Sequence, residues 1–200
     1  MRSRAVLSLL LVLAVVGCSG PGDDSDDASV DAAQLQSLVL QPEDLPSVFR
    51  RFDVGPLLAA DQPETGERSD PARFGRQQGW KARYTRSGTP QTRGPLVVES
   101  RTDLFEDGDG AERELEAYRD ETTAVESLED AALGDEAFMA TFLQPGGAGG
   151  RGVRFYLMAW REANVTASVL ANGFEGNLTL EQTLELARKQ QRRILRAAEL

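Results

Sequence analysis

The chain offers few side chains that could carry out chemistry. Its 200 residues include no histidine, one cysteine (Cys18) and two lysines (Lys81 and Lys189). Without histidine, the Ser-His-Asp and Cys-His catalytic arrangements, the common zinc sites and the usual general base near neutral pH are excluded. Neither lysine has the Ser-x-x-Lys neighbour of a serine–lysine hydrolase. The sequence therefore predicts no catalytic residue, no metal site and no cofactor.

Carboxylates remain as candidates for catalysis, because the chain carries 32 Asp and Glu residues. A carboxylate pair can hydrolyse a glycosidic bond, but no spacing in this sequence selects a pair. The Asp107-Gly108-Asp109-Gly110 stretch fails the calcium-loop pattern, because Phe105 or Ala111 occupies a position that needs an acid. A carboxylate-dependent hydrolase is therefore kept only as the third alternative for the function.

Cys18 stands at the end of an N-terminal segment with three parts. Arg2 and Arg4 precede an apolar run from Ala5 to Val16, and Gly17-Cys18 follows. This layout is typical of a bacterial export signal. A membrane-spanning helix needs about 20 apolar residues, and this run is too short for one. A plain secretory signal would favour an Ala-x-Ala cleavage site, which is absent next to Cys18.

Val15-Val16-Gly17-Cys18 resembles the lipobox of bacterial lipoproteins. The resemblance implies cleavage before Cys18, a diacylglycerol on its sulfur, and a protein anchored in the cell membrane by lipid on the extracytoplasmic side. The expected organisation is a signal peptide at 1–17, a disordered acidic tether at 18–33 and a single globular domain at 34–200. The tether is rich in Gly, Ser, Asp and Ala, so it buries too little apolar surface to fold.

The charge of the chain limits its partners. Cleavage before Cys18 removes Arg2 and Arg4, leaving 20 basic and 32 acidic residues and a formal net charge of about −12. A nucleic-acid partner requires a basic surface, so it is excluded. No second cysteine is present, so no intramolecular disulfide can form. The expected partners are the membrane, through the Cys18 lipid, and an unknown envelope protein or apolar ligand.

The hydrophobic periodicity of residues 34–200 predicts an α+β domain. We expect a curved antiparallel sheet of about five or six strands packed by two amphipathic helices. The expected strands cover residues 48–54, 80–86, 96–105, 137–143, 153–161 and 165–171, with a long loop at 55–78. A short helix is expected at 34–39 and amphipathic helices at 109–125 and 180–198, the last two beginning with capping boxes at Asp109/Glu112 and Thr179/Gln182.

Several turns of this domain are similar to those of uncharacterised lipoproteins of high-GC Gram-positive bacteria and their extracytoplasmic sensor-type domains. They are the Glu43–Pro46 turn, the Gly79-Trp80 strand start, the Leu133–Ala137 turn and the Trp160–Val165 hairpin. The resemblance implies a surface-exposed domain. These turns carry no catalytic group, so the resemblance transfers no site residue.

Strands 137–143 and 153–161 are apolar on both faces, so both faces must be covered. The favoured interpretation is a helix on each side. The alternative is an apolar groove under the glycine-rich loop 145–152, holding a lipid-like ligand or a partner segment. The candidate lining residues are Trp80, Tyr84, Tyr156, Met158 and Trp160. The function expected first is therefore non-enzymatic binding, and the second is a carrier of an apolar ligand.

Overall fold

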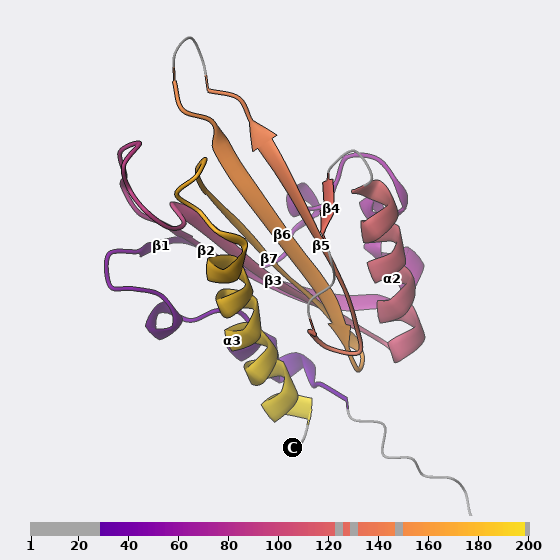
Figure 1. The fold of residues 1–200 in the computed structure, drawn as a ribbon. Helices are drawn as coiled ribbons and strands as arrows, with labels where there is room; N and C mark the ends of the chain where they lie inside the picture. Colours follow the sequence, from indigo (N-terminus) through magenta and orange to yellow (C-terminus); the bar gives the residue numbers. More distant parts are fainter. Residues whose placement is uncertain (1–28, 123–125, 129–131, 147–149, 199–200) are drawn as a thin grey trace, which may run out of the picture.

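The computed structural model describes residues 29–122, 126–128, 132–146 and 150–198, and its centre is one antiparallel sheet (Figure 1). The seven strands lie in the order β1-β2-β3-β7-β6-β5-β4. They are β1 (Arg50–Pro56), β2 (Arg76–Thr85), β3 (Val97–Phe105), β4 (Glu126–Leu128), β5 (Glu136–Gln144), β6 (Val153–Glu162) and β7 (Val165–Phe174). The α+β class is confirmed. All six expected strands are present with shifted ends, and β4 is a seventh.

Within the described residues, three α-helices and five short 3₁₀ helices accompany the sheet. The α-helices are α1 (Leu35–Leu38), α2 (Gly108–Glu121) and α3 (Leu180–Ala198). The 3₁₀ helices are η1 (Ala32–Gln34), η2 (Pro42–Asp44), η3 (Ala59–Asp61), η4 (Glu67–Ser69) and η5 (Pro71–Phe74). No helix within the described part of the chain is both long enough and apolar enough to cross a membrane.

Helix α3 covers one face of the sheet and closes the main core (Figure 1). Its buried stripe includes Leu184, Ala187 and Ile194, which follow the helical spacing that the sequence indicates. The predicted capping box at its start is confirmed. Thr179 Oγ1 accepts from the Gln182 amide at 3.3 Å, and Gln182 Oε1 accepts from the Thr179 amide at 3.0 Å.

Helix α2 lies on the opposite face, where its Leu115 joins a second cluster with side chains of β5 and β6. The expected capping residue of this helix was wrong. Asp107, not Asp109, is the N-cap, and its Oδ1 accepts from the Gly110 amide at 2.7 Å. The first turn of this helix packs closely on η5. A Cβ at Gly110 would lie 2.3 Å from the Phe74 carbonyl oxygen, so only glycine fits there.

The folded domain begins before residue 34. Val30 is buried in the main core, and its amide donates to Asn164 Oδ1 at 2.8 Å. Asp31 then caps η1 by accepting from the Ala33 amide. The end predicted for the tether, residue 33, is therefore wrong by at least four residues, because one apolar side chain and one cap inside it have partners in the domain. Residues 1–28, with the signal and Cys18, lie outside the described residues.

Strands β3 and β7 join the two parts of the sheet. They pair over eight residues on each strand, from Val97 opposite Asn172 to Leu104 opposite Val165. Gln190 of α3, fully buried, binds the middle of β3. Its Oε1 accepts from Ser100 Oγ, and its Nε2 donates to the Arg101 carbonyl and to Thr102 Oγ1. Strand β7 and helix α3, from the C-terminal part of the chain, therefore both bind β3 directly.

Candidate functional site

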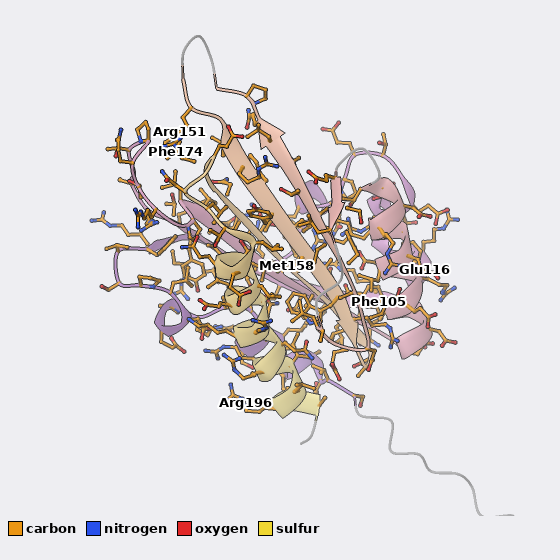
Figure 2. The ribbon with its side chains drawn as sticks, in the orientation of Figure 1. Phe105, Glu116, Arg151, Met158, Phe174 and Arg196 are labelled. Atoms are coloured by element: carbon orange, nitrogen blue, oxygen red, sulfur yellow. The ribbon has the colours of Figure 1, made fainter. Side chains whose placement is uncertain are left out.

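The predicted aromatic groove is not seen among the described residues. All five candidate residues lie on the α3 face, where they belong to the main core or pack against it: Trp80, Tyr84, Tyr156, Met158 and Trp160. Met158, labelled in Figure 2, lies between the sheet and α3. The exposed fractions of Met158 and Trp160 are 0 % and that of Tyr84 is 1 %. A helix on each side of the sheet covers both apolar faces, as the favoured interpretation expected.

The opposite face of β1, β2 and β3 carries charged side chains, several of which are buried. Lys81 of β2 has only 8 % of its surface exposed. Its Nζ lies 2.9 Å from a carboxylate oxygen of Asp53 and 2.5 Å from one of Asp61. Together with the neighbouring strand residues they form what we call the ionic cluster: Asp53, Asp61, Lys81, Arg83, Glu99, Arg101 and Asp103.

The arginines of the ionic cluster pair with carboxylates of neighbouring strands and of their own strand. Arg83 donates from Nε to Glu99 at 2.6 Å and from Nη1 to Asp53 at 2.9 Å. Arg101 donates from Nε to Asp103 at 2.7 Å. Buried charges require such partners, because removal from water is unfavourable for an isolated ion. The cluster therefore replaces an apolar core on this part of the sheet.

A strap, defined as residues 57–75, connects β1 to β2 and covers the ionic cluster. Arg101 donates to the Asp61 carbonyl at 3.2 Å and to Gln62 Oε1 at 2.8 Å. Farther along, the buried Arg68 donates to Glu114 of α2 at 2.6 Å. The Arg68 guanidinium also lies 3.5 Å from the centre of the Tyr118 ring, close enough for a cation–π interaction. The strap thus contacts both the sheet and α2 through charged groups.

The charges around Lys81 shift its pKa and those of its partners. Hydrogen bonds and attraction to Lys81 and Arg83 hold the pKa of Asp53 below its usual value, despite partial burial. Burial opposes ionisation of Asp61 most strongly, yet bonds from Lys81 and from the Leu58 amide still leave its pKa lowered. Conversely, the two carboxylates raise the pKa of Lys81 against the effect of burial. All three groups are therefore held in their charged forms at neutral pH.

Acid should weaken the protein through these carboxylates. A lowered folded-state pKa stabilises the fold above the unfolded pKa, near 3.8 for Asp53 and Asp61, and this stabilisation is lost as the pH falls through the folded value. We expect urea denaturation at several pH values between 7 and 3 to show this loss in the free energy of unfolding. In the variant Asp61→Asn, the free energy of unfolding should fall less steeply with decreasing pH below pH 4. An unchanged slope in this variant would contradict the assignment.

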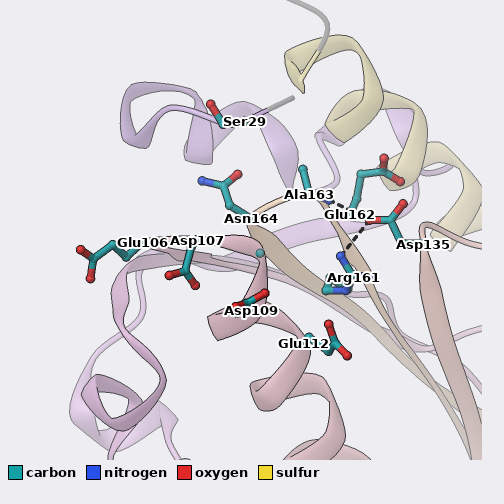
Figure 3. A pocket seen from close by; sticks show the side chains of 11 residues that line it. Ser29, Glu106, Asp107, Asp109, Glu112, Asp135, Arg161, Glu162, Ala163 and Asn164 are labelled. Atoms are coloured by element: carbon teal, nitrogen blue, oxygen red, sulfur yellow. Dashed lines mark hydrogen bonds and ion pairs between the residues drawn. The ribbon is translucent and has the colours of Figure 1, made fainter. Parts of the chain in front are cut away.

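A hollow of about 530 Å³ opens at the end of the sheet next to the first described residue, Ser29 (Figure 3). Six carboxylates line it, with a single arginine: Glu106, Asp107, Asp109, Glu112, Asp135, Glu162 and Arg161. Asp135 pairs with Arg161 at 3.0 Å and accepts from the Ala163 amide at 3.1 Å. Burial raises the pKa of Glu162, while a hydrogen bond from Gln191 opposes the shift. Across the described residues, no group of three or more acidic or sulfur ligands is arranged to hold a metal ion.

One sequence signal points to a polar residue beside the hollow. Asn164 belongs to the Trp160–Val165 hairpin that the sequence indicates. It does lie in the β6–β7 turn, and it also donates to the Val30 and Phe105 carbonyls at 3.3 Å. The ionic cluster has no such signal, because Asp61 and Lys81 are 20 residues apart and follow no motif.

Comparison with protein families and with curated protein sequences finds no match. Among solved structures, the fold is similar to the extracellular domain of PknH from Mycobacterium tuberculosis. The TM-score is 0.59 and the sequence identity 14 %, and the alignment covers 84 % of this chain and 98 % of the other. At this identity the likeness shows the fold. Nearly the whole length of the PknH domain aligns with this chain.

Proposed function

We propose that the protein is a lipid-anchored, extracytoplasmic binding domain with a sensor-like rather than a catalytic role. The observation that carries the proposal is the near-complete structural match to an extracellular domain, combined with the export signal and Cys18 in this sequence. The absence of histidine from the whole chain supports a role without catalysis, since the commonest general base and triad member is not available.

We propose an envelope protein as the partner. A carrier of apolar ligands would need the aromatic residues to line a cavity, whereas Trp160, Met158 and Tyr84 are buried in the core. Four large apolar side chains are exposed along β1 and its flanks: Val48, Phe52, Val54 and Leu58. Arg50 and Arg51, in the same segment, are exposed as well. Where exposed apolar side chains gather into a patch, they are typical of surfaces that bind proteins.

Anchoring is tested by the variant Cys18→Ser. Without the thiol no diacylglycerol can be attached, so we expect the protein to remain unprocessed or to leave the membrane fraction. Cell fractionation, intact-mass measurement and protease treatment of intact spheroplasts would report the anchor and the side on which the domain lies.

The control is Ser19→Ala, which keeps Cys18 and should remain lipidated and membrane-bound. An unmodified Cys18 in the wild-type protein, or a mature N-terminus elsewhere, would overturn the anchor. Protection of the domain from protease outside intact spheroplasts would overturn the extracytoplasmic location.

A further inference from the structure

The sheet surface beneath the strap carries more positive than negative groups. Strands β2 and β3 contribute four cations and two carboxylates: Arg76, Lys81, Arg83, Arg101, Glu99 and Asp103. This local excess is opposite in sign to the formal net charge of the chain, −10. Asp53 of β1 adds one further carboxylate, and the strap adds Asp61 from above. The surface therefore depends on the strap for part of its neutralisation.

Asp61 contacts this surface as an external carboxylate would. Its Oδ1 lies 2.5 Å from Lys81 Nζ and 3.6 Å from Arg83 Nη1. Its other oxygen accepts from the Leu58 amide at 2.9 Å, which fixes the orientation of the carboxylate within the strap. The two Arg101 contacts to Asp61 and Gln62 lie beside it. If the strap moved away, Lys81, Arg83 and Arg101 would each lose a contact with it, while the pairs within the sheet would stay.

Few apolar contacts hold the central part of the strap. Leu57 and Phe74, at its two ends, are buried, whereas none of residues 58–67 is buried and Leu58 is 61 % exposed. Segments with little buried apolar surface open locally at a lower free energy than the whole domain unfolds. Residues 58–67 of the strap should therefore be able to open while the sheet, α2 and α3 stay folded.

We propose that Lys81, Arg83 and Arg101 form an anion-binding site that Asp61 occupies as an internal ligand. The strap opens and a small multivalent anion, with several carboxylate or phosphate oxygens, takes the place of Asp61. The proposal rests on the proposed function as a binding domain and adds a ligand class to it. Lys81 and Arg101 supply the donors that the strap releases, and Arg83 adds positive charge beside them. Arginine and lysine bind such oxygens strongly when water is largely excluded.

The first test is amide hydrogen exchange of the lipid-anchored protein in detergent. Sodium pyrophosphate and sodium citrate, as phosphate and carboxylate probes, are compared with sodium chloride at matched ionic strength. We expect a saturable increase in exchange at residues 58–67 with pyrophosphate, citrate or both, beyond the increase in chloride. The active probe identifies the oxygen class. Equal exchange in all three salts would mean that the ion pairs are only screened, and would overturn the site.

The second test uses two variants that each remove one carboxylate from Lys81. Asp61→Asn removes the ligand that belongs to the strap, and Asp53→Asn removes the one that belongs to β1. The apparent anion affinity of the wild type is reduced because only the open fraction of the protein can bind. Asp61→Asn should therefore bind the active anion about tenfold more tightly, and its backbone amides at residues 58–67 should exchange faster. Asp53→Asn changes the net charge by the same amount but leaves Asp61 of the strap in place. Its amide exchange at residues 58–67 should therefore match that of the wild type.

Calorimetric titration would measure the affinities. Unchanged anion affinity in Asp61→Asn, or equally fast strap exchange in both variants, would overturn the internal-ligand assignment. Either failure leaves the proposed anchor and location untouched, because fractionation and protease treatment of the Cys18→Ser variant report them separately.

Discussion

Replacing Trp160 with alanine is expected to lower the free energy of unfolding by about 3–5 kcal/mol, the usual cost of truncating a large core aromatic residue. Trp160 is fully buried. Its neighbours across the sheet are Ala137 on β5 and Ala167 on β7, which are too small to fill the space that the indole would leave. Urea denaturation followed by circular dichroism would measure the loss.

The matched control for this prediction is Trp80→Ala. Trp80 belongs to the same face of the sheet but is only partly buried, so the same truncation should cost less. A smaller loss at Trp160 than at Trp80 would contradict the burial of Trp160. It would also reopen the groove that the sequence left as an alternative.

The second large effect is expected for Gln190→Ala, which should lower the free energy of unfolding by about 2–4 kcal/mol. Gln190 is fully buried and makes three hydrogen bonds to β3, at 2.8–3.0 Å. Its removal leaves Thr102 and the Arg101 carbonyl without that partner inside the core. A buried polar group that loses its partner is costly because water cannot replace it.

A double-mutant cycle with Ser100→Ala would test whether these groups act together. Ser100 Oγ donates to Gln190 Oε1 and accepts from the Leu40 amide, so the two side chains share one network. The losses for Ser100→Ala and Gln190→Ala should be non-additive, as expected for residues in contact. Strictly additive losses would show that Gln190 stabilises the protein only by filling space.

Strong local periodicity explains which parts of the fold could be predicted. Strand β6 alternates over its whole length and the α3 stripe repeats over 19 residues, so both were located within two residues of their ends. Strand β4 has only three residues, Glu126–Leu128, with no alternation to detect. The α2 cap was misplaced because Asp109, with Glu112 three residues later, fits the capping-box pattern, whereas Asp107 is followed at that distance by Gly110, which has no side chain to complete one.

The ionic cluster could not be predicted for a different physical reason. Alternation at β2 correctly separates Trp80, Ala82 and Tyr84 from Lys81 and Arg83, but charged residues on the second face ordinarily indicate solvent. Here the strap covers them, and its contacts depend on Asp61 reaching Lys81 from another segment. The same limit applies to Trp160, because an aromatic residue on an alternating strand fits either a core or a groove. The position of α3 decides between them.

The pairing of β3 with β7 has a consequence for the order in which the protein can fold. The partner strands are about 60 to 75 residues apart in the chain, so the N-terminal meander β1-β2-β3 keeps an open edge until residues 165–174 are available. Long-range pairing of this kind slows folding, since the intervening chain must first be brought together. A chain emerging from its N-terminus therefore stays incompletely folded until nearly all of it has appeared. That is the state in which a polypeptide can still be threaded through a narrow translocation channel.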